Sequence, residues 1–415
     1  MFRPNSRAHP KSSLNGRLFV YLVKMNKQWR ISIRAYFKRI SHHPITQILP
    51  NYLLKQIEEA VEPTGKYTKL PFMVFVRFML VCLLWTPRIP STRRLAKLSG
   101  NTLIQTFSGI KSVSHQALAD RFQTVSSTGL RTLLNLLADS ARRSSSKDLR
   151  RFGVLKLFDC TTVEGSAVFY DWAAPNGDKY ALRFALIIDY QSDVPCGLQD
   201  ASETTSDNSV FPKLLKQINQ GDTTVWDAGF TKLVCFQDIR KKGAFWIARM
   251  ANIYSVQVVH RRNIHPNDKK PINRWTLQQD DRVLVGTPDS GGPILARRLV
   301  WTNPAEEDPL VIWTNHGRWR PKRIFEAYQA RWRVEVHFRW LKSELKIDHL
   351  PSHDPQGLEN FFLLVLLAWL LLRLFSIWYS HQPWSEFSCR DAVLDFQNSL
   401  IEGLIDRIVA LTTDS

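Results

Sequence analysis

Cysteine is scarce in this chain, and its cysteines form no recognisable motif. The five, scattered through 415 residues, are Cys82, Cys160, Cys196, Cys235 and Cys389. No two have the spacing of a zinc pair or of a redox motif, which argues against a structural zinc site and against a disulfide scaffold. A reducing cytoplasm is therefore the simplest compartment.

Acidic residues are absent from the first 50 positions, which carry ten Lys or Arg. The segment also lacks a signal peptide, because the apolar stretch Leu18–Val23 is too short to be one. Apolar and aromatic residues there and in Trp29–Ile40 favour an ordered arm, or an arm that folds on DNA. We predict a basic N-terminal arm over residues 1–45, with a disordered tail as the alternative.

The whole chain is short of acid, since 37 Asp and Glu face 56 Lys and Arg and leave a formal net charge of +19. Residues 1–50 contribute +10 of this excess, and residues 317–346, with nine basic and three acidic residues, contribute +6. Charge concentrated in this way predicts a polyanionic partner, with nucleic acid favoured over an anionic membrane surface.

The two long apolar segments of the chain both contain polar residues. Phe72–Thr86 is short and contains Arg77, while Phe361–Tyr379 is long enough to cross a bilayer but contains Arg373 and Ser376. A buried arginine would be costly near mid-bilayer. We therefore predict two buried helices and no membrane, and keep a basic membrane-associated protein as an alternative.

Residues 46–147 predict a helical DNA-binding region. Ser91–Leu98 and Ser114–Val125 each open with a serine cap and carry basic residues, so they could form a helix-turn-helix or simply pack as helices. Ala141–Lys147 is a plausible linker. A C-terminal helical region is expected over residues 347–415.

Residues 148–346 change to an α/β pattern. Five short apolar strands are predicted at 154–158, 182–190, 194–198, 223–226 and 244–250, with helices at 210–218 and 231–242. A β-rich insertion follows at about 251–315, and then a long helix at Lys322–Leu345. The order strand–strand–strand–helix–strand–helix–strand predicts a ribonuclease-H-like catalytic domain.

Two aspartates end apolar strands of this pattern. Asp159 stands in LFDCTT, and Asp227 stands in VWDAGF, where Gly229 allows a sharp turn. Each position by itself is also an ordinary place for a turn-forming aspartate.

The long helix carries a more specific signal. Tyr328, Arg331, Glu335 and Lys342 fall within about 60° of arc at helical spacing. A solvated charged face is one interpretation. The alternative is a rigid polar stripe on a tightly packed helix, because the other faces carry Trp332, Phe338, Trp340 and Leu341.

The spacing Tyr-x2-Arg-x3-Glu-x6-Lys resembles the YREK signature of DDE insertion-sequence transposases of the IS-four type, relatives of Tn-five and Tn-ten. The LFDCTT and VWDAGF segments resemble the two aspartate blocks of this family, with Cys160 where Ser or Gly is commoner. The resemblance covers about residues 90–350.

The resemblance implies a catalytic and metal-binding triad of Asp159, Asp227 and Glu335 with two Mg²⁺ ions, for which Mn²⁺ can substitute. Hard divalent cations do bind carboxylate oxygens and serve phosphodiester chemistry. It further implies cut-and-paste excision and integration of an insertion sequence in a bacterial cytoplasm. A catalytically inactive DNA-binding relative is the alternative.

The resemblance also implies partners and binding residues. The DNA would be double-stranded, comprising the terminal inverted repeats and the target, and it would be bound by a homodimer on paired ends. Tyr328, Arg331 and Lys342 would hold the terminal phosphates. In relatives the insertion helps to manage a flipped base, which makes three tryptophans candidate stacking groups or plain core residues: Trp275, Trp301 and Trp313.

Overall fold

The computed structural model describes residues 48–62, 70–86, 91–143, 149–165, 174–176, 179–200, 206–250, 253–345, 350–378 and 388–400. The predicted basic arm at 1–45 lies outside these described residues, as do most of the predicted linker and the last fifteen positions.

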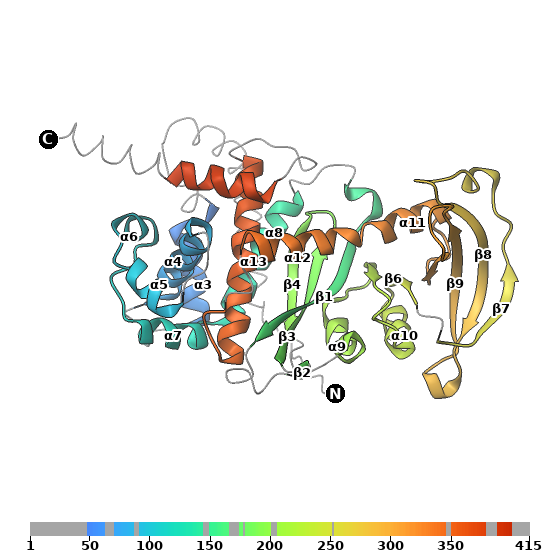
Figure 1. Cartoon of the computed structure of the whole chain (residues 1–415), viewed down its shortest axis with the longest axis horizontal. Helices are drawn as coiled ribbons and strands as arrows, with labels where there is room; N and C mark the ends of the chain where they lie inside the picture. The colour runs from blue at the N-terminus through green and yellow to red at the C-terminus, as the bar shows by residue number, and fades with distance from the viewer. Residues whose placement is uncertain are drawn as a thin grey trace, which may run out of the picture.

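The mixed α/β architecture predicted from the sequence is confirmed, and its strands join in one ten-stranded sheet (Figure 1). In chain order they are β1 (Leu155–Gly165), β2 (Ala174–Asn176), β3 (Lys179–Asp189), β4 (Val194–Asp200), β5 (Thr223–Trp226), β6 (Phe245–Arg249), β7 (Val256–Arg261), β8 (Thr276–Val285), β9 (Ile294–Thr302) and β10 (Leu310–Thr314). Across the sheet the order is β2-β3-β1-β5-β6-β10-β9-β8-β7, and β4 also pairs with β3.

Strand pairing in this sheet is parallel at its centre and antiparallel on both sides. Strands β1, β5 and β6 run parallel to one another, and the other pairings are antiparallel. The predicted β-rich insertion forms β7 to β10, and it extends the main sheet because β10 pairs with β6. Carboxyl ends of β1 and β5 therefore meet at one edge of the parallel part, where connecting loops can bring polar side chains together.

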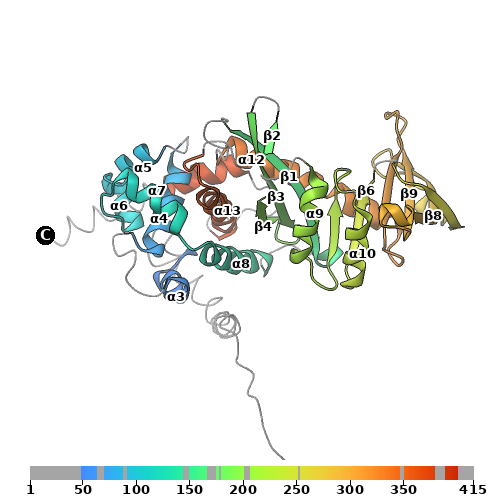
Figure 2. The same cartoon turned by 90° about the horizontal axis from the view of Figure 1, so that it is seen from below.

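Helices cover both faces of the sheet. Successive strand residues point to opposite faces, so Leu157 packs into one core layer and Phe158 into the other. Helices α9 (Asp207–Leu214) and α10 (Leu233–Lys241) pack on the Phe158 side, whereas α11 (Pro321–Gln329) and α12 (Trp332–Ser343) pack on the Leu157 side (Figure 2).

A helical body stands at the opposite end of the molecule from β7–β9 (Figure 1). Its N-terminal helices are α3 (Asn51–Val61), α4 (Phe72–Trp85), α5 (Thr92–Leu98), α6 (Thr102–Ser108), α7 (His115–Thr124) and α8 (Ser127–Arg143). The two predicted short helices correspond to α5 and α7, but the turn-rich connection between them is wrong. It contains α6, which begins at Thr102 because the side chain of the preceding Asn101 accepts from the N–H groups of Leu103 and Ile104.

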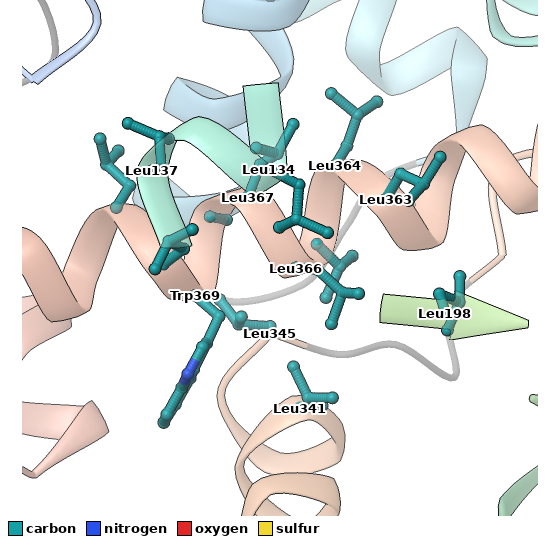
Figure 3. Packing of buried hydrophobic residues seen from close by; sticks show 14 of the residues in the cluster. Leu134, Leu137, Leu198, Leu341, Leu345, Leu363, Leu364, Leu366, Leu367 and Trp369 are labelled. Carbon is teal, nitrogen blue, oxygen red and sulfur yellow. The ribbon is translucent and has the colours of Figure 1, made fainter. Parts of the chain in front are cut away.

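The long apolar helix α13 (Pro355–Trp378) forms the centre of the helical body. It packs against α4, α7, α8 and β4, and Figure 3 shows leucines of α8, α12 and β4 around it. The window long and apolar enough to cross a membrane is 94% buried inside the protein. Arg373 on this helix is also buried, and its Nη2 lies 3.2 Å from Oδ2 of Asp193 in the β3–β4 turn. The prediction of a buried core helix is therefore confirmed.

Candidate active site

Asp159 lies inside β1, not at its end as the sequence predicted. Strand β1 continues to Gly165 because β3 pairs with it along its length, from Lys156↔Asp189 to Gly165↔Tyr180. On the other side, however, the parallel partner β5 ends at Trp226. Asp159 therefore stands where the sheet loses its parallel neighbour, and alternation places it on the same face as Leu157, toward α12.

Asp227 directly follows β5, as the sequence predicted. The chain turns at once, and the Phe230 N–H donates to the Asp227 carbonyl oxygen at 3.1 Å. Gly229 is required in this turn by close packing, because a Cβ at that position would lie 2.2 Å from Oδ2 of Asp207. The turn thus brings the Asp227 carboxylate beside β1.

The helix predicted at Lys322–Leu345 is broken into α11 and α12. The break falls at Ala330 and Arg331, where the N–H groups of Arg331 and Val334 bond to carbonyl oxygens three residues back, at Tyr328 and Arg331. Both break residues keep right-handed helical angles, so the two helices run nearly in line (Figure 1). Arg331 is therefore the residue that immediately precedes α12, next to Asp159, Asp227 and Glu335.

The guanidinium of Arg331 lies among all three predicted acids. Its Nη1 is 3.6 Å from Oδ2 of Asp159, its Nε is 3.7 Å from Oδ1 of Asp227, and its Nη2 is 2.7 Å from Oε1 of Glu335. Three carboxylates that are far apart in the sequence thus converge on one cation. We name Asp159, Asp227, Glu335 and Arg331 the acidic cluster.

Burial and neighbouring charges together raise the pKa values of both Asp159 and Arg331. Burial raises the pKa of Asp159 to about 7, against the Cys160 N–H that donates to it and the nearby Arg331, while Asp227 and Asp207 add to the rise. Burial lowers the pKa of Arg331, but the carboxylates around it more than offset this and raise it above its ordinary value. Arg331 therefore stays positively charged, and this charge stabilises the ionised form of the buried Asp159 carboxyl group.

The cluster fits a metal in ligand type but not in its present arrangement. Carboxylate oxygens are the ligands that hard divalent cations prefer. Among the described residues, however, no three His, Cys, Asp or Glu side chains are arranged to hold a metal ion. The guanidinium fills the space between the acids, so ions could enter only if Arg331 turned away.

The other two predicted binding residues lie on either side of the cluster. Tyr328 is buried at the end of α11, and burial raises the pKa of its hydroxyl, with Arg331 opposing that rise. Lys342 is exposed near the end of α12, and its Nζ donates to the carbonyl oxygen of Thr162 at 3.3 Å. Helix spacing thus carries Lys342 past the acids along β1.

The prediction that α12 is tightly packed on its other faces is wrong at Trp332, which is 57% exposed. Trp332 directly follows Arg331 and is the first residue of α12. Its ring points toward solvent beside the helix break. Of the three candidate stacking residues, Trp301 and Trp313 are buried in the core and cannot present a ring face. Trp275 is partly buried and faces Phe325 at 6.2 Å between ring centroids.

Sequence reasoning missed a second charged pair behind the acids. Asp207, at the start of α9, forms an ion pair with Arg183 on β3, and its charge raises the pKa of both Asp159 and Cys160. It also missed Arg249, the last residue of β6, whose charge lowers the pKa of Tyr328. The local spacing of these residues does not indicate that they belong to the site, since β3, α9 and β6 come together only in the folded protein.

Comparison with known proteins places these residues in a named family. The family model described as "Transposase DDE domain" matches residues 151–371, just over half of the chain. Both aspartates, the whole of α11 and α12 and much of α13 fall inside this match.

Individual relatives agree with the family model. A Sinorhizobium fredii transposase, y4zB, is 26% identical over 240 residues, which is 58% of this chain and 65% of the relative. The Geobacillus stearothermophilus transposase for insertion sequence element IS5377 is 23% identical over 249 residues, 59% of this chain and 62% of the relative. The chain therefore spans somewhat under two thirds of these relatives.

A more distant relative and one solved structure complete the comparison. The Synechocystis transposase for insertion sequence element IS4SA is 21% identical over 191 residues, covering 46% of this chain and 52% of the relative. The cryo-EM structure of a piggyBac transposase synaptic complex with hairpin DNA aligns over 88% of this chain and 81% of its own, at 10% identity and a TM-score of 0.42.

Proposed function

This chain belongs to the family of transposases with a DDE domain, and from that premise we propose that it cuts and rejoins DNA strands at the acidic cluster. The observation that carries the proposal is the convergence of Asp159, Asp227 and Glu335 on one cation, with contacts of 3.6, 3.7 and 2.7 Å. Acids that share one guanidinium are close enough to share divalent cations once it withdraws.

The strand pattern supports a ribonuclease-H-like catalytic domain. Strands β4, β3 and β1 form an antiparallel meander, and β5 and β6 then add parallel to β1. Helices α9 and α10 intervene in the predicted order. The YREK spacing supports the IS-four type within the family.

The proposed reaction is hydrolysis of a phosphodiester at the insertion-sequence end, followed by attack of the freed 3′-hydroxyl on target DNA. Two divalent cations, Mg²⁺ or Mn²⁺, would supply stabilisation of the entering and leaving oxygens. Asp159 and Asp227 would hold them from the sheet, and Glu335 would do so from α12. The Asp159 side chain is only 15% exposed, and a carboxylate in such a low-dielectric position attracts cations more strongly than one in water.

Arg331 has two roles in this proposal. Without metal, its guanidinium neutralises the three carboxylates. When the carboxylates hold metal, the Arg331 side chain would turn to a DNA phosphate, which a guanidinium can bind in a bidentate way. Tyr328 and Lys342 would flank the same strand, and the exposed Trp332 ring offers a surface on which a base can stack.

The test uses the purified chain and a supercoiled plasmid that carries its gene with the native flanking DNA. We expect Mg²⁺-dependent nicked and linear products at the element ends. Asp159→Ala, Asp227→Ala and Glu335→Ala should lose this cleavage and remain folded. Asp238→Asn, a carboxylate on α10 that pairs with Lys241, is the control and should cut normally. Full cleavage by any of the three triad variants would reject the proposal.

A further inference from the structure

The register of β7, β8 and β9 places three basic side chains in one row. His260 on β7 pairs with Arg282 on β8, and Arg282 pairs with Arg297 on β9. Directly paired residues project from the same face of a sheet about 4.5–5.5 Å apart. The row therefore lines up a histidine and two arginines on one surface.

Like charges in direct cross-strand contact are destabilising unless something neutralises them. Arg297 is neutralised, because Asp280 accepts from its Nε and its Nη2, both at 2.7 Å. On the other face of the same strands, Arg298 is likewise paired with Asp281 at 2.7 Å. Arg282, in contrast, is exposed, and the described residues supply it with no acidic partner.

This row borders a hollow of about 590 Å³. Its wall is basic and contains no acidic residue, and the side chains that give it this character are Arg240, His260, Arg262, Arg282 and Arg297. The remaining residues of the wall are uncharged. Such a surface attracts an extended anion.

An aromatic stack supports one side of the hollow. The Phe245 ring, which lines the hollow, stacks on His316 with 4.1 Å between the ring centroids. His316 in turn stacks on Trp319 with 4.0 Å between the ring centroids. Burial lowers the pKa of His316 to about 3, helped by Arg323 and Arg297, so this ring is neutral. The stack therefore adds no charge to this side of the hollow.

The hollow and the acidic cluster lie at opposite ends of the parallel strands. Phe245 pairs with Thr223 at the beginning of β5, whereas Asp227 follows the end of that strand. The hollow thus lies at the beginning of β6 and beside β7–β9, at the end of the parallel strands that is away from Asp227. A ligand in the hollow does not touch the catalytic carboxylates.

We propose that this hollow binds the phosphate backbone of duplex DNA at a point away from the cut, an inference that rests on the proposed function. Arginines bind phosphate through paired N–H groups, and Arg282 and Arg240, both exposed and without an ion-pair partner among the described residues, are available to do so. Backbone binding also offsets the repulsion within the basic row. The hollow would therefore hold the duplex in place while its end lies in the acidic cluster.

The test measures how the affinity for a fluorescent mixed-sequence duplex depends on salt. Each phosphate contact contributes about 0.9 to the slope of log affinity against log salt. Arg240→Gln with Arg282→Gln should reduce that slope by about 1.8. The control is Lys216→Gln with Arg390→Gln, which removes two exposed charges outside both the hollow and the predicted DNA-binding region and should leave the slope unchanged.

Two further results decide the proposal. An unchanged slope in the Arg240 and Arg282 double variant, or an equal fall in the control, would overturn it. So would a fall with single-stranded DNA and none with duplex. Cleavage of the plasmid at saturating DNA and low salt should proceed at the wild-type rate, because the hollow is away from the acids. Loss of the proposed function would abolish cleavage in the wild type as well, so the two failures are distinguishable.

Discussion

Replacing Arg331 by Met tests whether its guanidinium is the internal counter-ion of the three carboxylates. Methionine keeps most of the side-chain volume of arginine but has no charge. It leaves without a cation the three carboxylates whose oxygens lie 2.7–3.7 Å from the nitrogens of Arg331 in the wild type. Leaving a buried charge unpaired costs about 3–5 kcal/mol. Here Asp159, Asp227 and Glu335 are 15, 39 and 32% exposed, so solvent screening reduces the expected loss to about 1–3 kcal/mol.

The assay is thermal unfolding in EDTA and in Mg²⁺, read by intrinsic fluorescence. Arg331→Met should unfold a few degrees below the wild type in EDTA. Mg²⁺ should stabilise it more than the wild type, because the ion no longer competes with the guanidinium and binding to the native state alone adds stability. Arg339→Met, an exposed arginine on the same helix, is the matched control and should change neither temperature.

Two results would refute this reasoning. If Arg331→Met and Arg339→Met unfold at the same temperature in EDTA, the guanidinium does not neutralise the acids. If Mg²⁺ stabilises the wild type as much as the variant, Arg331 does not occupy the place that the ions need. Both readouts are independent of DNA cleavage.

Two other predictions concern stability. The pKa of His316 is lowered from 6.5 to about 3, so between these two pH values the unfolded chain binds a proton on this ring that the native protein does not bind. The free energy of unfolding should therefore fall by about 1.4 kcal/mol per pH unit as the pH drops through this range. His316→Gln should flatten this dependence in urea unfolding, and an unchanged slope would contradict the cause. Asp193→Asn should cost about 3 kcal/mol, because Arg373 is buried and Arg333 pairs with the same carboxylate at 2.9 Å. The exposed Asp391→Asn should cost almost nothing, and equal losses in the two variants would argue against a buried pair.

Local pattern was enough to predict most of the fold. Strand β5 was predicted at its observed bounds, and the apolar helix α13 was correctly predicted to be buried because Arg373 interrupts it. These features depend on neighbours within one or two turns of chain, which periodicity can show. Helix α6 was not predicted, because its start depends on a single capping side chain, that of Asn101.

The candidate site divides in the same way. Spacing along the chain identified Asp159, Asp227 and Glu335 as candidates, since strand ends and helical offsets are local properties. Their convergence required β1 and β5, whose paired residues are 68 positions apart, to pair in parallel, and α12, more than a hundred positions from β1, to pack on that face.

The sequence by itself determined the composition of this protein's chemistry: three acids, a basic surplus and helical spacing that marks Arg331. Only the tertiary structure decided what each charge faces. Arg331 became the counter-ion of the acids because the helix breaks beside them, and Arg282 became an unpaired cation because the strand register aligns it with His260 and Arg297. Electrostatic energy depends on distance and burial, and neither is a property of position along the chain.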